Sequence, residues 1–144
     1  MTITRENIWN RDSDKAKFIR AYLEAILWTE CGDSDDTLDS SYGIDDFTDS
    51  AIEKAVKDCL SFMDEKADHL LRKAYKKPYP GGTGFYTPEY AGHDFLLTRN
   101  GHGAGFWDRD LGDIGECLTA LCGFKTEFPE VTAYVNDENK IEID

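Results

Sequence analysis

The segment from Gly92 to Asp113 contains the side chains best suited to chemistry. It holds His93, Asp94, His102 and Asp108, whose imidazole and carboxylate groups could ligate a metal ion or transfer a proton. It is also rich in glycine, which is typical of tight turns and of close approaches between backbones. Two interpretations stay open. The segment is either the centre of a small metal-dependent enzyme or a hairpin whose polar residues are structural or bind a partner.

The sequence favours the second interpretation. It contains no zinc-protease motif, nucleophile elbow or phosphate-binding loop. We therefore predict no catalytic residue, no resident metal and no cofactor. The candidate binding residues of this segment are His93, Asp94, Arg99, Asn100, His102, Trp107, Asp108 and Arg109. If the segment is purely structural, Trp107 is expected to lie in the core.

A second candidate surface is the acidic run from Glu30 to Ser50, which contains eight Asp and Glu residues and no Lys or Arg. Such a run can bind calcium, remain solvated or dock onto a basic protein. An EF-hand loop that began at Asp33 would need glycine and glutamate where the chain has Leu38 and Ile44, so that pattern fails. The candidate acidic surface consists of Asp33, Asp35, Asp36, Asp39, Asp45, Asp46 and Asp49.

The overall charge restricts the partners. The 144 residues include 16 Lys and Arg against 29 Asp and Glu, which gives a net charge of −13. This balance argues against direct binding of nucleic acid and against an anionic membrane surface. Carboxylates along a face can instead imitate the phosphates of DNA and occupy the basic groove of a DNA-binding protein. A basic cluster at Arg72, Lys73, Lys76 and Lys77 makes the charge bipolar, and could pair with the acidic run or bind an anion.

Length and composition predict one domain over residues 1–144. The apolar spacing predicts helices over residues 14–30, 50–75 and 111–121, with Ser50 and Glu53 forming a capping box. A Pro/Gly-rich connector spans residues 78–92. Strand patterns around Asn100-Gly101 and around residues 136–139 predict two hairpins, at 95–107 and 131–143. The expected fold class is α+β, with two N-terminal helices packed on a small antiparallel sheet of two hairpins and one helix between them.

The run from His93 to Arg109 resembles a group of small bacteriophage and prophage proteins that share the motif HDFxLTRNGHGxGFWDR. Leu96 occupies the variable position, and the resemblance covers roughly residues 20–143. It implies a phage origin and no particular activity. Met1 to Asp12 has no continuous apolar stretch typical of a secretion signal, so we expect the chain to act in the host cytoplasm.

Together these features predict a phage accessory protein that binds a host protein with a basic surface, in the form of an acidic DNA mimic that inhibits a defence or nucleic-acid-binding protein. The alternatives are the metal-dependent enzyme and a structural or virion-associated protein. The sequence predicts no membrane partner and does not indicate an oligomeric state.

Overall fold

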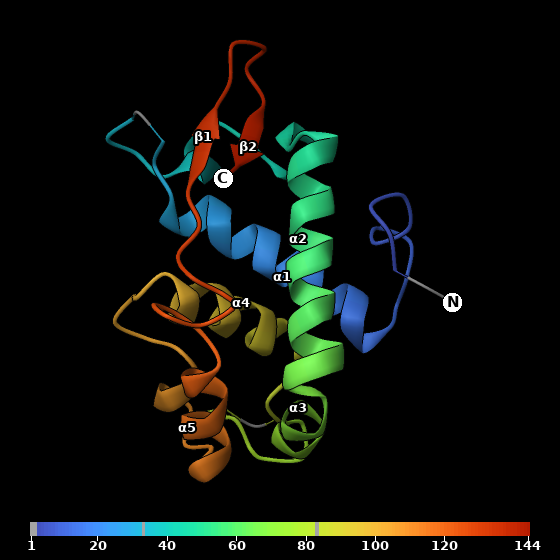
Figure 1. The fold of residues 1–144 in the computed structure, drawn as a ribbon, viewed down its shortest axis with the longest axis vertical. Helices are drawn as coiled ribbons and strands as arrows, with labels where there is room; N and C mark the ends of the chain where they lie inside the picture. Colours follow the sequence, from blue (N-terminus) through green and yellow to red (C-terminus); the bar gives the residue numbers. More distant parts are fainter. Residues whose placement is uncertain (1–2, 33, 83) are drawn as a thin grey trace.

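The computed structural model describes residues 3–32, 34–82 and 84–144. These residues form five α-helices, four short 3-10 or π segments and one two-stranded antiparallel sheet (Figure 1). The molecule is therefore mainly helical, and the predicted α+β arrangement of two helices on a sheet of two hairpins is wrong. The elements in chain order are α1 (Asp14–Thr29), η1 (Leu38–Ser40), η2 (Ile44–Asp46), α2 (Asp49–Ser61), η3 (Phe62–Lys66), α3 (Asp68–Ala74), α4 (Pro88–Arg99), η4 (Phe106–Asp108), α5 (Asp113–Ala120), β1 (Ala133–Val135) and β2 (Ile141–Ile143).

Helix α1 is the central element of the fold. It begins where the sequence predicts, because the hydroxyl of Ser13 accepts a hydrogen bond from the amide of Ala16 at 3.2 Å. Nine of its sixteen residues are buried, more than one amphipathic face requires. Figure 1 shows the reason: α1 (blue) crosses behind α2, and α4 also packs against it.

The predicted helix over residues 50–75 is present but divided. Helix α2 passes into the π-helical segment η3 and then into α3, so the chain changes its hydrogen-bonding pattern at Phe62. The predicted capping box at Ser50 is wrong, because Thr48 caps α2 by accepting a hydrogen bond from the amide of Ala51 at 3.1 Å. Within η3, Phe62 and Met63 are buried, which directs this part of the chain into the core.

The predicted hairpin at residues 95–107 is wrong, because residues 88–99 form helix α4. Thr87 caps this helix and Pro88 occupies its first turn, which suits proline because the missing amide would have no helical partner there. Asn100-Gly101, which the sequence indicated as a hairpin turn, ends the helix instead. Gly101 has a φ of 72°, the left-handed conformation in which helices commonly terminate.

The C-terminal elements confirm the sequence prediction. Helix α5 occupies most of the predicted range, and β1 pairs with β2 in the register Ala133↔Ile143, Tyr134↔Glu142 and Val135↔Ile141. The amide of Asn136 donates to the carbonyl of Lys140 at 2.8 Å and closes the turn. This hairpin lies at one end of the molecule, and α3 and α5 lie at the other (Figure 1).

A cluster of phenylalanine rings from separate parts of the chain fills the core. Phe62 stacks on Phe95 with ring centroids 4.3 Å apart, and it meets Phe128 edge-on at 5.5 Å. Phe18 packs against both Phe62 and Phe95, and Phe106 packs against Phe62. Trp107 is 44% exposed, so the expectation that it fills the core is wrong. The neighbouring Phe106 takes that place and is fully buried.

The crossing of α1 and α4 depends on Gly92. A Cβ atom at this position would lie 2.1 Å from the carbonyl oxygen of Phe18, so only glycine lets the two backbones approach this closely. We expect Gly92→Ala to lower the free energy of unfolding by about 1–3 kcal/mol because the helices must separate. Urea denaturation would measure the change.

The matched control for this prediction is Gly103→Ala, in the same segment. A Cβ atom on Gly103 meets nothing within 4 Å, so this variant should stay within about 0.5 kcal/mol of the parent. Equal losses in the two variants would contradict the role given to Gly92.

Candidate functional site

The segment 92–109 brings part of its predicted site together around a buried carboxylate. Asp94 lies on α4 and is completely buried. Arg109 donates to both of its oxygens, with Nε 3.1 Å from each and a terminal nitrogen 3.0 Å from Oδ1. Tyr86 donates its hydroxyl to Oδ2 at 2.7 Å. These contacts occupy the oxygens of Asp94 that a metal ion or a proton relay would need.

Burial dominates the electrostatics of Asp94. Desolvation raises the pKa of its carboxyl above the ordinary value, although the hydrogen bonds from Arg109 and Tyr86 oppose that rise. Burial beside Asp94 in turn raises the pKa of Tyr86 well above its ordinary value. The group is thus a buried carboxylate paired in bidentate geometry with a partly exposed guanidinium, and removal of the guanidinium would leave the buried charge without a partner.

Tyrosines of the predicted connector enclose this ion pair. Tyr79 and Tyr90 stack with centroids 3.8 Å apart, and both rings approach Tyr86 within 6.5 Å. The guanidinium of Arg109 lies 5.9 Å from the centroid of Tyr79. Sequence reasoning did not single out these tyrosines as site residues. The only signal in the sequence is the density of aromatic side chains in a connector otherwise made of proline and glycine.

Arg99 and Asn100 pin the end of α4 to the rest of the molecule. Arg99 is buried and donates to the carboxylate of Asp58 at 3.0 Å, to the hydroxyl of Tyr22 at 3.1 Å and to the carbonyl of Pro129 at 2.9 Å. The side chain of Asn100 exchanges two hydrogen bonds with the backbone of Val131, at 2.9 and 3.1 Å. Both predicted binding residues therefore make internal contacts, and the partner Asp58 was missed.

The other predicted members of this segment are not gathered into one centre. His93 packs against Trp28 with tilted rings whose centroids are 4.4 Å apart, whereas Trp107 and Asp108 are exposed and His102 is partly buried. Within residues 3–32, 34–82 and 84–144, no three His, Cys, Asp or Glu side chains come close enough to hold a metal ion. The predicted quartet of His93, Asp94, His102 and Asp108 is therefore not a metal-binding arrangement.

The acidic run forms a folded surface rather than a free loop. Leu38 and Phe47 are buried and anchor it in the core. Asp39 accepts a hydrogen bond from the hydroxyl of Thr37, and Asp46 accepts one from the amide of Gly43. The carboxylate of Asp46 also lies 3.7 Å from the ammonium of Lys140. Asp49 is the first residue of α2. Asp35, Asp36 and Asp45 are exposed, and no ion pair within the described residues reaches them. The predicted Asp33 lies outside the described residues.

The C-terminal hairpin is bound to the acidic run. The amide of Thr48 donates to the carbonyl of Ile141 at 3.0 Å, and Tyr42 donates to the side chain of Asn139 at 2.8 Å. The carboxylates of both segments consequently share one end of the molecule. We call this the acidic end, and it consists of Asp35, Asp36, Asp39, Asp45, Asp46, Asp49, Asp137, Glu138, Glu142 and Asp144.

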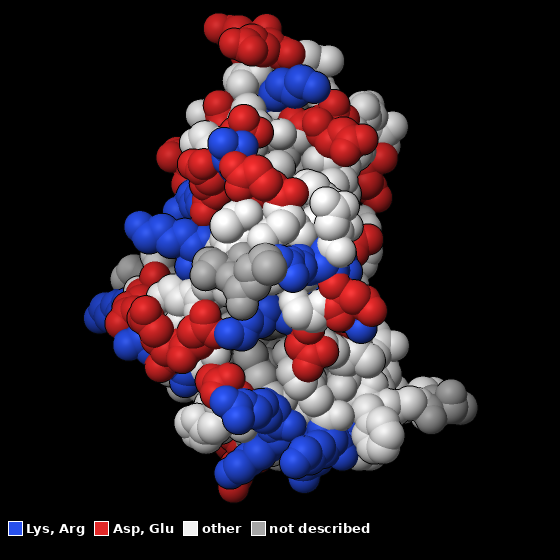
Figure 2. Space-filling view, turned by 90° about the vertical axis from the view of Figure 1, so that its right-hand side faces the viewer, with Lys and Arg blue, Asp and Glu red and all other residues white. Residues whose placement is uncertain are grey.

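The basic cluster lies at the opposite end. Arg72, Lys73, Lys76 and Lys77 are exposed around the end of α3, and Arg72 pairs with Asp68 one turn away. Figure 2 shows red side chains gathered over the end that carries the hairpin and blue side chains over the other end. Among the described residues, none of these four cations forms an ion pair with the acidic run, a pairing that the sequence left open.

Comparison of the chain with protein-family models, with curated proteins and with solved structures finds no match. The resemblance of residues 93–109 to phage proteins therefore stays a prediction. Among the described residues, no helix is long and apolar enough to cross a membrane. The charges and contacts of the chain itself are the basis for assigning a function.

The Asp94–Arg109 pair gives a direct test of the internal role of the motif. In Arg109→Met the buried carboxylate loses its counter-charge, so we expect the free energy of unfolding at pH 7 to fall by about 3–5 kcal/mol. The loss should shrink as the pH is lowered towards about 4, because the unpaired carboxyl of Asp94 then becomes protonated in the folded variant and no buried charge is left. Urea denaturation at both pH values would measure it.

Arg72→Met is the control, because it removes the same charge from an exposed pair with Asp68. Such a pair contributes about 0.2–1 kcal/mol, so the control should change stability little. A loss in Arg109→Met no larger than in Arg72→Met would show that the Asp94 pair is not a buried structural contact.

His93 gives a prediction about pH. Burial and the nearby charge of Arg109 lower the pKa of its imidazole, whose buried Nε2 has no hydrogen-bond partner among the described residues. The unfolded chain therefore binds a proton more readily, and stability should fall as the pH drops through the ordinary pKa of histidine, about 6.5. In His93→Phe, which keeps a ring against Trp28, this part of the pH dependence should disappear. An unchanged slope in urea titrations from pH 7.5 to pH 5.5 would contradict the assignment.

Proposed function

We propose that the chain is a bacteriophage accessory protein that acts in the host cytoplasm by binding a host protein through the acidic end. The partner carries a basic surface that contacts nucleic acid, and the carboxylates of the acidic end take the place of DNA phosphates there. The phage setting rests on the resemblance of residues 93–109. The binding mode rests on the distribution of charge.

The single observation that supports this function best is the separation of charge along the molecule. Exposed carboxylates from the acidic run and the hairpin lie at one end, and the cations of α3 lie at the other (Figure 2). A dipolar distribution of this kind orients an approaching basic protein towards the acidic end and speeds the encounter. The contacts between residues 42–48 and 139–142 hold the two acidic segments in one rigid surface.

The interior contacts of the motif agree with a binding protein. Asp94, Arg99 and Arg109 make hydrogen bonds inside the fold and are not presented to a substrate. The exposed side chains include the carboxylates of the acidic end, the cations of the basic cluster and a small number of aromatic rings. Binding through the surface therefore has more support than catalysis by the motif.

The test is affinity capture from bacterial lysate with three matched proteins. The first is the parent, and the second carries Asp35→Asn, Asp36→Asn and Asp45→Asn. The third carries Glu24→Gln, Glu65→Gln and Glu116→Gln, which removes the same number of exposed charges away from the acidic end. Capture is compared at about 50 mM and about 200 mM salt and in the presence of competing duplex DNA.

We expect a DNA-binding or defence protein to be retained by the parent and by the Gln variant, lost from the Asn variant, and released by salt or DNA. Retention of no such protein at either salt concentration would contradict the proposal, as would equal retention by the two variants. Recovery of the chain mainly in purified phage particles would favour the virion-associated alternative.

A further inference from the structure

An open groove lies at the C-terminal end of α4. Its walls are the last residues of α4 and the segment that follows α5, and its volume is about 460 Å³. The ring of Phe124 stands at its edge and is 86% exposed, the largest exposure among the large apolar side chains that are exposed in the described part of the chain. The residues that line the groove are Thr98, Arg99, Asn100, Gly101, Gly123, Phe124, Pro129 and Glu130.

The groove is preformed, because internal contacts fix its two walls to each other. Arg99 donates to the carbonyl of Pro129, and Asn100 exchanges its two hydrogen bonds with Val131. Gly101 and Gly123 have φ values of 72° and 102°, a backbone conformation that favours glycine. Because glycine has no side chain, the backbone of the groove is left uncovered at these two positions. A ligand that enters would not have to order these walls, which lowers the cost of binding.

The residues that line the groove favour a planar cation, such as a guanidinium group. The carboxylate of Glu130 is exposed on one side. The C-terminal end of α4 adds the negative end of a helix dipole, and the cation in its last turn, Arg99, is already paired with Asp58. Phe124 adds an exposed aromatic face. The ammonium of Lys125 lies 5.6 Å from its centroid, so an incoming cation would displace Lys125 from this ring. A guanidinium group pairs with a carboxylate and stacks on an aromatic ring at the same time, which an ammonium group cannot do.

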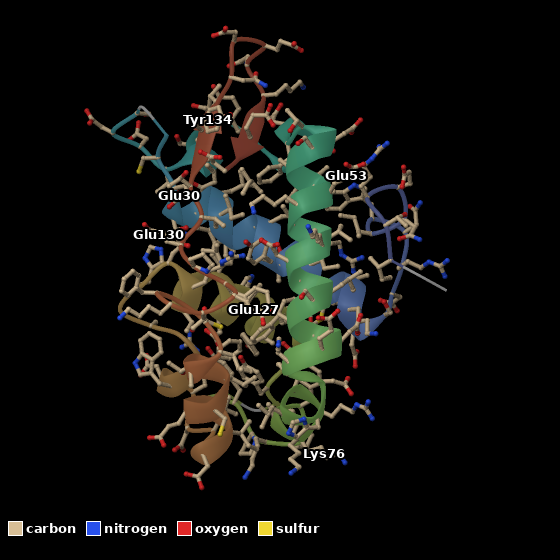
Figure 3. The ribbon with its side chains drawn as sticks, in the orientation of Figure 1. Glu30, Glu53, Lys76, Glu127, Glu130 and Tyr134 are labelled. Carbon is tan, nitrogen blue, oxygen red and sulfur yellow. The ribbon has the colours of Figure 1, made fainter. Side chains whose placement is uncertain are left out.

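We propose that this groove receives an arginine side chain of a protein partner, which stacks on Phe124 and pairs with Glu130. The inference rests on the proposed function, since it assumes a partner with a basic surface. Glu130 lies on the same side of the molecule as Glu30 and Tyr134 in Figure 3, so a partner on the acidic end could reach the groove from there. Exposed aromatic residues beside charged groups are typical of the positions that dominate interface energetics.

The test uses the full chain labelled with nitrogen-15 and a blocked Gly-Arg-Gly peptide as the probe, followed by amide chemical shifts. We expect saturable shifts of the amides of Gly101, Gly123 and Phe124. The same peptide with citrulline, which has the shape of arginine without its charge, should not produce them. Phe124→Ala and Glu130→Gln should each weaken binding by about two- to fivefold.

Two control variants match these substitutions. Phe85→Ala removes another exposed ring, and Glu116→Gln removes another exposed carboxylate, both outside the groove. Neither should change the affinity for the arginine peptide. Equal shifts with the citrulline peptide, shifts confined to the acidic end, or no saturable shift in the groove would each overturn the proposal. The last two results would leave the capture of a partner by the acidic end intact, so the two proposals fail separately.

Discussion

The close crossing of α1 and α4 is the constraint on which the rest of the structure depends. At Gly92 the two backbones approach so closely that a Cβ atom would overlap the carbonyl of Phe18. This contact brings Phe95 against Phe18 and Phe62, and so completes the aromatic core. It also places Asp94 and Arg99 in the interior, where each needs a partner from another part of the chain.

Those internal partners explain the composition of the motif. Arg109 donates hydrogen bonds to Asp94, and Arg99 donates to Asp58 and to the carbonyl of Pro129. Asn100 accepts a hydrogen bond from the amide of Val131. Side chains whose types suggest catalysis therefore link α4 to the segments before and after it. The carboxylates of the acidic run and of the hairpin lie instead on the outer surface, together at one end of the molecule (Figure 2).

Local signals in the sequence predicted several elements well. The apolar spacing over residues 14–30 predicted α1, and the strand patterns around residues 136–139 predicted the hairpin of β1 and β2. The prediction failed at α4, because Asn-Gly is a signal both for a hairpin turn and for the end of a helix, and only tertiary burial decides between them. The ion pairs of Asp94 and Arg99 were also missed, since their partners lie 15 and 41 positions away and no local pattern encodes such distances.

Native-state hydrogen exchange is the most direct test of the central place given to α4. If the fold depends on its burial, the amides of Phe95, Leu96 and Arg99 open only when the whole chain unfolds. Their exchange should then report the same free energy as global unfolding in urea and should be slower than exchange in the β1–β2 hairpin. Exchange of these amides through local opening, at a free energy well below the global value, would contradict the account.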